Sequence, residues 1–370
     1  MALTLLNFQS ALVHLCLMNL KQLAENLGLS QTTVSRALNG YPEVSEATRR
    51  KVREAAEQYD YRPNTRAKSL ATGKAMTIGH VVPVSSKHEM VNPIFSDFIA
   101  GAGEAYSRAG YDLLLSVVPD SEQESVYRDI ANRQIVDGLI VHAPTLQDPR
   151  LPMLQELSIP FVVHGRSTGV TTPYNWLDVN NRRAFERATG LLLDLGHRRI
   201  ALLNGLATMD FAHRRTDGYK RALMDRGIGI DPDLIFHDEM TENYGFEIAR
   251  RLLSQANPPS AFVVSSIIPA IGVRRAIKDA NLVFGKDVSI IVHDDDLSYF
   301  RNAGDVPLFS AVRSSVREAG RQSAEMLLEI IRRRELGRPD GEPMQVLMEA
   351  ELMIGQSTGP FSHDSSTEPA

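Results

Sequence analysis

Short apolar runs alternate with amphipathic stretches along most of the chain, and this alternation constrains its fold more than any other feature. Seven runs have the length and composition of buried strands: Ile78–Val82, Asp112–Val117, Gly138–His142, Phe161–Val163, Ile200–Leu203, Phe262–Val264 and Val288–Val292. Helix-compatible stretches separate them, near residues 94–109, 121–134, 181–195, 214–226, 242–256 and 269–280. Continuous apolar strands are typical of parallel sheets that helices cover on both faces. The pattern predicts an α/β body of two Rossmann-like parallel-sheet subdomains.

The charges divide the chain into a basic head and an acidic body. Between Met18 and Lys74, ten lysine and arginine residues outnumber six aspartate and glutamate residues, a balance of +4. Residues 1–17 carry no charged side chain, so the net charge of −5 leaves −9 for residues 75–370. A basic head suggests a polyanionic partner such as nucleic acid. On charge alone, an idle basic surface explains the head equally well.

The basic head has the pattern of three short helices. Apolar residues from Leu20 to Leu27 recur at i, i+3, i+4 and i+7, the stripe of an amphipathic helix. Gly28 suits the left-handed residue that ends a helix, and Ser30 suits the N-cap of a second helix whose outer arc is entirely polar. A third helix is expected after Ser45. Two helices joined by a short turn with glycine predict an all-α helix-turn-helix unit.

The residues LKQLAENLGLSQTTVSRALNGYPEVSEATRRKVREAAEQYDYRPNTRAKSL carry a more specific signature. They match LAxxxGxSxxTVSRxLN, then VSxxTRxxVxxAxxxxxYxPN, then AxxL. In this they closely resemble the DNA-binding headpiece of the LacI/GalR (lactose-repressor) family of bacterial transcriptional regulators.

This resemblance implies a role for each matching position. Gln31 and Thr32 are expected to read bases in the major groove. Further groove and backbone contacts are implied for Ser35, Arg36 and Asn39. Phosphate-contacting or headpiece-orienting roles are implied for Thr33, Ser45, Thr48, Tyr61 and Asn64. A hinge helix is also implied, in which Leu70, with Ala67 on the same small-residue face, wedges into a minor-groove step. Such a wedge unstacks the bases and bends the duplex.

The body resembles the effector domain of the same family, which is itself similar to periplasmic sugar-binding proteins. The landmarks include IGHVVP, VDGLIV, IPFVVHGR, GHRRIALLNG and PPSAFVVSS, and the whole likeness spans about Met18 to Gly355. It implies three crossings between the subdomains, near Trp176–Asn180, Leu308–Val312 and Arg338–Met344. It also implies an effector cleft at the carboxyl ends of the strands. The predicted effector-binding residues are Arg215 as a fork of donors, Asp294 as a hydroxyl acceptor, and Asn92, Phe95, Arg166, Trp176, Ser266 and Arg313.

The residues expected in the cleft differ from those of many relatives, so the identity of the effector cannot be inferred from any one relative. Ser266-Ile267 stands where many relatives have Asn-Asp, Val292 where they have glycine, and Gly165 where an acidic residue is common. A sugar or sugar derivative is the predicted effector, and a purine or nucleoside is the alternative. The predicted function is that of a sequence-specific DNA-binding transcriptional repressor whose operator affinity is controlled by this small molecule.

Other functional classes fit the sequence less well. A non-regulatory solute-binding protein would share the body but would need an export signal and no basic head. No nucleophile elbow, zinc-protease, Walker or complete dinucleotide-binding motif occurs, so the protein is not expected to be an enzyme. The acidic run Asp294–Asp296 is interpreted as a solvated loop, so neither a metal nor another cofactor is expected. The single cysteine, Cys16, excludes a disulfide framework.

The sequence predicts five segments: an extension at 1–17 that is non-native or disordered, a helix-turn-helix headpiece at 18–63, a hinge helix and linker at 64–75, a bilobed effector-binding and dimerisation domain at 76–356, and a disordered tail at 357–370. The extension lacks the charged start of a signal peptide and is too short to span a bilayer. A cytoplasmic protein without a membrane partner is therefore predicted.

Two macromolecular partners are predicted. A single headpiece makes too few contacts to select one site in a genome, so a homodimer on a palindromic double-stranded DNA operator is expected. The dimer contact is expected to use apolar residues around Met90, Val91, Ile94 and Phe98. The tail has no leucine heptad, so assembly is expected to stop at the dimer.

Overall fold

A computed structural model of the protein describes residues 18–61, 73–83, 92–119, 122–302, 304–338 and 341–361. The chain separates into two compact units, Met1–Ala75 and Met76–Ala370, which we call the headpiece and the body. Several predictions fall outside the described residues: those for 1–17, Asn64, Ala67, Leu70, Met90, Val91 and 362–370.

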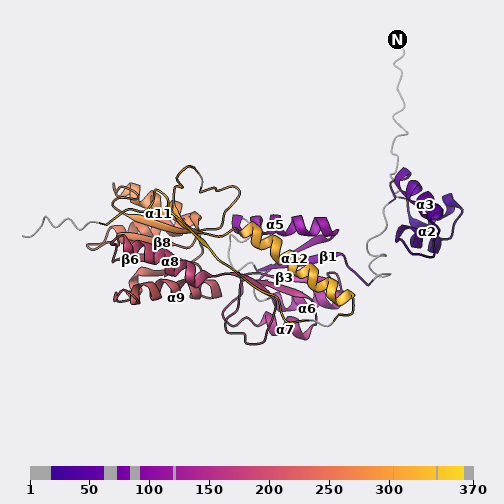
Figure 1. Ribbon diagram of the computed structural model, residues 1–370, viewed down its shortest axis with the longest axis horizontal. Coiled ribbons are helices and arrows are strands. Elements are labelled where there is room, and N and C mark those ends of the chain that lie inside the picture. Colours follow the sequence, from indigo (N-terminus) through magenta and orange to yellow (C-terminus); the bar gives the residue numbers. More distant parts are fainter. Residues whose placement is uncertain are drawn as a thin grey trace, which may run out of the picture. The chain divides into compact units, whose positions relative to one another are not determined.

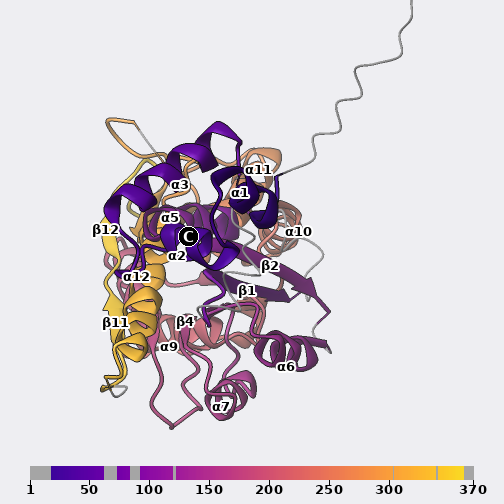
Figure 2. The ribbon, with the colours of Figure 1, turned by 90° about the vertical axis from the view of Figure 1, so that its right-hand side faces the viewer.

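The headpiece contains three helices, α1 (Leu20–Leu27), α2 (Gln31–Leu38) and α3 (Glu46–Gln58) (Figure 2). Each begins at a side-chain cap, because Asn19, Ser30 and Ser45 each accept a hydrogen bond from a backbone N–H of the first turn. Gly28 ends α1 at φ +66°, a conformation that glycine adopts without steric cost. The buried core between the helices is apolar: Leu23, Ala24, Val34, Ala37, Val44, Val52, Ala55 and Ala56. The predicted helix-turn-helix is confirmed.

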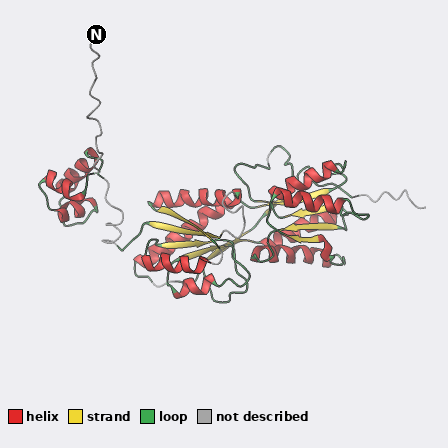
Figure 3. Cartoon of the chain, turned by 180° about the vertical axis from the view of Figure 1, so that it is seen from behind, coloured by secondary structure: helices red, strands yellow, loops and turns green. Residues whose placement is uncertain are grey.

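The body has two α/β lobes, and each has a six-stranded sheet between layers of helices (Figure 3). In the first lobe the strand order is β11-β5-β4-β3-β1-β2, with β1 (Thr77–Pro83), β2 (Asp112–Val118), β3 (Gly138–Val141), β4 (Phe161–His164), β5 (Trp176–Val179) and β11 (Gln345–Met348). In the second lobe it is β12-β10-β9-β8-β6-β7, with β6 (Ile200–Asn204), β7 (Ile235–His237), β8 (Ala261–Val264), β9 (Ser289–Asp294), β10 (Ser310–Arg313) and β12 (Glu351–Met353). Among the described strands only β12 is antiparallel to its neighbour.

The two predicted parallel-sheet subdomains, and all seven predicted strands, are confirmed. The structure adds five strands that the apolar runs did not indicate: β5, β7, β10, β11 and β12. Three of these, β7, β11 and β12, lie at sheet edges and stay partly exposed, so their sequences have no continuous apolar run.

Helices cover both faces of each sheet (Figure 1). In the first lobe, α5 (Pro93–Ala109) and α12 (Val316–Glu335) pack on one face, and α6 (Gln123–Arg133) and α7 (Arg150–Glu156) on the other. In the second lobe, the pairs are α8 (Asn181–Asp194) with α9 (Asp210–Met224), and α10 (Glu242–Leu253) with α11 (Ile267–Asp279). A short 3-10 helix, η3 (Pro232–Leu234), precedes β7.

The pair α5 and α12 is packed so closely that glycine is required at the crossing. A Cβ atom on Gly101 would lie 1.9 Å from the carbonyl oxygen of Arg317. A Cβ atom on Gly320 would lie 2.1 Å from the carbonyl oxygen of Phe98. Both distances are far below van der Waals contact, so this approach depends on the missing side chains. It fixes α5, which carries Phe95 and Phe98 to the functional site.

The chain passes between the lobes three times. The first crossing joins β5 to α8 directly after Val179, within the predicted stretch. The other two predictions were wrong by a few residues. The chain remains in the second sheet as β10 until Arg313, and it remains in the first sheet as β11 until Met348. These short strands extend each lobe beyond the position that composition indicated.

The prediction of a disordered tail was wrong for residues 357–361. Ser357 is fully buried, and its backbone carbonyl accepts the N–H of Ile290 at 2.8 Å. Its hydroxyl accepts the N–H of Ser310 at 2.7 Å. The polar composition suggested disorder, but the hydroxyl and backbone groups of this segment complete the hydrogen bonding of β9 and β10.

Candidate functional site

The second helix of the headpiece presents a polar face. Val34 and Ala37 are buried on its inner side. On the outer side, the predicted base-reading residues Gln31 and Thr32 are exposed. Arg36 and Asn39 are also exposed, and Ser35 is half-buried. A short helix with an exposed polar arc has the geometry of a helix that enters the major groove.

The predicted phosphate-contacting residues of the headpiece have local structural roles. The Thr33 hydroxyl lies 2.8 Å from the Ser30 hydroxyl at the start of α2. Ser45 and Thr48 form the equivalent pair at the start of α3, 2.9 Å apart. Tyr61 is half-buried and packs against the headpiece core. The two hydroxyl pairs lie at helix N-termini, where backbone N–H groups and the helix dipole attract anions.

The basic excess of the head is unevenly distributed. Residues 18–61, which include all three helices, carry six basic and six acidic side chains. The excess of four therefore comes from the segment between Arg62 and Lys74. The three helices therefore have no net charge, and the positive excess expected to attract a polyanion lies in the sequence that follows them.

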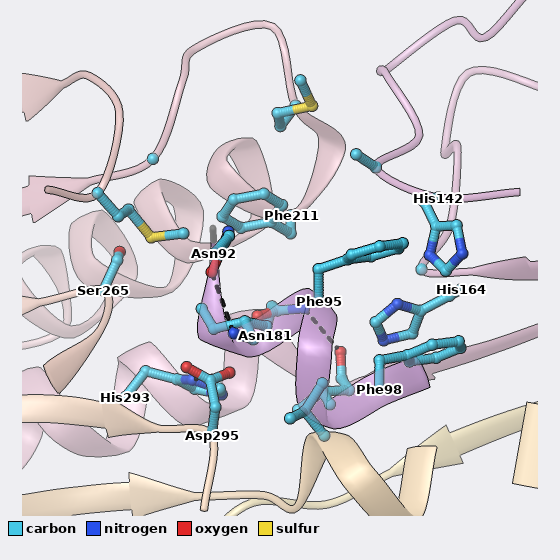
Figure 4. Close-up of a pocket in the computed structure, with 18 of the residues that line it drawn as sticks. Asn92, Phe95, Phe98, His142, His164, Asn181, Phe211, Ser265, His293 and Asp295 are labelled. Carbon is cyan, nitrogen blue, oxygen red and sulfur yellow. Dashed lines mark hydrogen bonds and ion pairs between the residues drawn. The ribbon is translucent and has the colours of Figure 1, made fainter. Parts of the chain in front are cut away.

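The body contains a cavity of about 460 Å³ between its two lobes. It lies where the strands of both sheets reach their carboxyl ends, as the sequence predicted. Figure 4 shows its labelled lining residues: Asn92, Phe95, Phe98, His142 and His164 from the first lobe, and Asn181, Phe211, Ser265, His293 and Asp295 from the second.

The structure brings three of the eight predicted pocket residues to this cavity: Arg215, Asn92 and Phe95. The other five, Asp294, Arg166, Trp176, Ser266 and Arg313, do not line it. In four of these cases an adjacent residue does, namely Asp295, Gly165, Ser265 and Ser314. Successive side chains of a strand point to opposite faces, so an error of one residue at a strand end reverses the direction of the side chain.

The five predicted residues that do not line the cavity have other partners. Asp294 is buried and accepts the backbone N–H of Asp296 at 2.9 Å, and burial raises the pKa of its carboxyl group. Ser266 caps α11, and the Arg313 guanidinium pairs with Asp296. Arg166 donates to Asp178 at 2.8 Å and lies 4.9 Å above the Trp176 ring.

Arg215 is held rigidly at the cavity. Its Nε donates to Asn181 Oδ1 at 2.7 Å, and a terminal nitrogen donates to the carbonyl oxygen of Ser265 at 2.9 Å. The guanidinium lies between the rings of Phe185 and Phe211, 4.9 and 4.8 Å from their centroids. Burial lowers the pKa of Arg215 to about 10, so it stays charged at neutral pH. Its remaining N–H groups have no acceptor among the described residues.

Asp295 supplies the opposite charge. The residue is only 9% exposed, and its carboxylate lies 3.3 Å from His293 Nδ1. No backbone N–H in the described part of the chain donates to this carboxylate. A buried carboxylate with free acceptor capacity and a fixed guanidinium in one cavity suit a ligand with neighbouring hydroxyl groups, each of which both donates and accepts.

A polar network that the sequence did not indicate joins the lobes beside the cavity. Arg214 of α9 donates to Asp210 at 2.5 Å and also pairs with Asp178 of β5. Asp210 accepts hydrogen bonds from the backbone and hydroxyl of Thr168, at 2.7 and 2.6 Å. The signal available in the sequence was the Asp-x-x-x-Arg spacing, which places both side chains on one helix face.

The first lobe closes its end of the cavity with aromatic rings. Phe95 and Phe98 stand almost perpendicular to His142, at 82° and 86°. His164 stacks on Phe98 with ring centroids 4.3 Å apart. Burial lowers the pKa of His164 to about 4, so the ring is neutral at physiological pH. The aromatic rings of the first lobe therefore bring no charge to the cavity, whereas the second lobe contributes Arg215 and Asp295.

A helix-turn-helix headpiece on a two-lobed domain with an interlobe cavity defines a DNA-binding protein that responds to a small molecule. Residues 19–64 match the family described as bacterial regulatory proteins, lacI family, and residues 189–358 match the periplasmic binding protein-like domain. The chain belongs to the LacI family and is a DNA-binding transcriptional regulator. In the described part of the chain, no helix is both long and apolar enough to cross a membrane.

The similarity to individual relatives extends over nearly the whole chain. The HTH-type transcriptional regulator AglR of Rhizobium meliloti (strain 1021) is 44% identical over 343 residues, 92% of this chain and 94% of its own. The regulator CelR of Thermobifida fusca is 29% identical over 91% of this chain and 97% of its own. A solved complex of CelR with cellobiose is 27% identical, covers 92% of this chain and 99% of that one, and superposes with a TM-score of 0.67. The lac repressor dimer bound to operator has the same fold, with a TM-score of 0.78 at 24% identity over 92% of this chain and 99% of that one.

Proposed function

We propose that this regulator is a sugar-responsive repressor, in which a neutral sugar in the interlobe cavity controls the affinity of two headpieces for a palindromic operator. The observation that carries the proposal is the pair Arg215 and Asp295, a buried donor and a buried acceptor that face one cavity. The cavity volume of about 460 Å³ falls within the range of small-molecule sites. The complex of the related CelR with cellobiose adds support for a sugar of one or two rings.

The aromatic end of the cavity favours a sugar over a purine. A flat base is held best between parallel ring faces, but Phe95 and Phe98 both stand nearly perpendicular to His142. This arrangement offers ring edges and isolated faces, which suit the alternating C–H and O–H surfaces of a pyranose.

A ligand in the interlobe cavity would contact both lobes. Asp295 and Arg215 belong to the second lobe, and His142 and Phe95 to the first. A ligand that binds all four stabilises one relative position of the lobes, and it can shift the equilibrium only by its difference in affinity for the two positions. The chain enters the first lobe through β1, so this lobe is the one connected directly to the headpiece. In the bound state we expect Leu70 to wedge into the operator and bend it.

The homodimer that we propose uses a different surface from the one that the sequence indicated. Phe98 is 1% exposed and packs within the first lobe, so it is not available for a dimer contact. The edge strand β2 instead exposes Leu113, Leu115 and Val117, at 38%, 37% and 40%. An apolar stripe on a free sheet edge is normally covered, and a second copy of the chain would cover it.

Ligand binding is tested by calorimetry with glucose, cellobiose, maltose, sucrose and adenosine. Asp295→Asn removes the charged acceptor and should weaken binding of the active sugar about tenfold to a hundredfold. Asp294→Asn is the matched control, because that side chain lies outside the cavity. Operator affinity, measured by fluorescence anisotropy, should change on addition of the same sugar. Binding of adenosine alone, or loss of binding only in Asp294→Asn, would refute the assignment.

The dimer is tested by light scattering of full-length variants. Leu115→Lys places a charge on the β2 stripe and should give monomers with weak operator binding. Ile230→Lys is the control, since Ile230 is equally exposed at 37% and lies elsewhere, in the second lobe. Dimers that persist in Leu115→Lys would contradict the proposed contact.

A further inference from the structure

Three hydrogen-bonded side chains, which we call the relay, run from the core of the first lobe to the cavity wall. Tyr106 comes from α5, His80 from β1, and His142 directly follows β3. The Tyr106 hydroxyl lies 2.8 Å from His80 Nε2, and His80 Nδ1 lies 2.9 Å from His142 Nε2. Tyr106 and His80 are essentially inaccessible to solvent, at 1% and 0% exposure, and only His142 reaches the cavity.

Both imidazoles in the relay are neutral. Burial lowers the pKa of His80 to about 3 and holds the pKa of His142 well below its usual value of 6.5. A neutral imidazole carries one proton, so one ring nitrogen donates and the other accepts. The direction of the hydrogen bonds in the relay therefore determines which nitrogen of His142 carries the proton.

The direction follows from Tyr106. Within the described residues its hydroxyl has no partner other than His80. A buried hydroxyl proton without an acceptor is costly, so the hydroxyl donates to His80 Nε2. His80 must then carry its proton on Nδ1 and donate it to His142 Nε2. His142 in turn must carry its proton on Nδ1, and in the described structure this nitrogen has no protein partner.

We propose that Tyr106 and His80 are positioning residues that fix His142 as a hydrogen-bond donor toward the cavity, so that the site selects a ligand with an acceptor oxygen at this end. A ring oxygen, a glycosidic oxygen, or a hydroxyl whose own hydrogen points elsewhere meets this requirement. A ligand that presents an N–H group there is rejected, because two donors would face each other. The identity of the ligand as a sugar rests on the proposed function, whereas the direction of the relay does not.

The relay itself is tested without any ligand. Full-length, deuterated protein with ¹⁵N-labelled histidine gives long-range ¹H–¹⁵N correlations that distinguish the two neutral tautomers. The His142 signals, assigned by their loss in His142→Asn, should show the Nδ1–H form. An Nε2–H pattern, or the pattern of a charged ring, would overturn the proposal.

Tyr106→Phe tests the role of the hydroxyl. This variant should leave His142 as a mixture of tautomers, and equal populations would weaken sugar binding about twofold, because only half of the molecules remain competent. Tyr219→Phe is the matched control, since it also removes a buried hydroxyl, one that donates to the carbonyl of Ile200 at 2.7 Å in the other lobe. Unchanged tautomers in Tyr106→Phe would show that the hydroxyl does not set the direction.

The donor role is tested with the sugars of the calorimetric series. His142→Leu should weaken the sugar that binds about fivefold, and His142→Asn, whose amide can donate, should largely restore it. If the accepting oxygen is a hydroxyl, its deoxyfluoro analogue should keep its affinity, since fluorine replaces the accepting oxygen but cannot donate. A loss of affinity in His142→Asn as large as that in His142→Leu would overturn the donor role. If no sugar binds, the proposed function fails and the tautomer measurement still decides the relay.

Discussion

Removing the residues after Gln356 should destabilise the body, although this segment is polar. Ser357 exchanges hydrogen bonds with β9 through Ile290, at 2.8 and 2.5 Å, and accepts the N–H of Ser310 at 2.7 Å. Further along, Gly359 donates to the hydroxyl of Ser289 at 3.1 Å, and Phe361 donates to a carbonyl at the end of α8 at 2.8 Å. The Phe361 ring also packs on His197, with centroids 5.3 Å apart.

These contacts set the size of the effect. Five hydrogen bonds at about 1 kcal/mol each give a loss of roughly 4–5 kcal/mol in the free energy of unfolding. A domain of this size changes its Tm by about 2–4 °C per kcal/mol, so a decrease of about 10 °C is expected. The loss is large because backbone groups of β9 and β10 that form hydrogen bonds with this segment would be left without partners in its absence.

The measurement compares two chains that differ only in this segment, one ending at Phe361 and one ending at Gln356. Thermal melting followed by circular dichroism, with urea unfolding at 25 °C, gives both the change in Tm and the change in free energy. Light scattering of the same samples shows whether assembly is altered. Equal melting temperatures for the two chains would refute the structural role of residues 357–361.

Three other changes have defined outcomes. Gln31→Ala should weaken operator binding by about 1–3 kcal/mol and relax the preference at one base pair. Anisotropy titrations against single-base operator variants measure both effects. An equal loss of affinity for random DNA would contradict the base-reading role of Gln31. Gly101→Ala forces a Cβ atom to 1.9 Å from a backbone oxygen of α12 and should destabilise the body by roughly 1–3 kcal/mol in urea unfolding. Gly103→Ala, where the added Cβ meets nothing within 4 Å, should be neutral or stabilising. Stability should also fall as the pH drops below 6.5, because His80 and His142 take up protons in the unfolded chain near pH 6.5 but resist them when buried. Between pH 7 and pH 5 His80 should contribute a loss of about 2 kcal/mol, and His142 a further loss in the same direction, measurable by urea unfolding at both pH values, and a flat profile would contradict their burial as neutral rings.

The architecture could be predicted from the sequence because the signals for it are local. The caps at Asn19, Ser30 and Ser45 and the apolar spacing of the headpiece helices act within a few residues along the chain. Continuous apolar runs indicated all the interior strands except β5 and β10, and the rule that ligands lie at the carboxyl ends of parallel strands predicted the position of the cavity. The exposed polar arc of α2 followed from helical periodicity alone.

The side chains that meet in the cavity could not be predicted in the same way, because their meeting depends on contacts between distant parts of the chain. The choice of Asp295 over Asp294 depends on how the chain leaves β9, and Asp296 turns it with a left-handed φ of +56°. His80 has the sequence setting of an ordinary core residue in β1. It meets Tyr106 and His142 only because α5 packs over β1 and because β3 pairs beside β1, contacts between residues 26 and 62 positions apart. Hydrogen-bond direction and side-chain facing depend on such long-range packing, whereas helix caps and strand composition depend on neighbours in the chain.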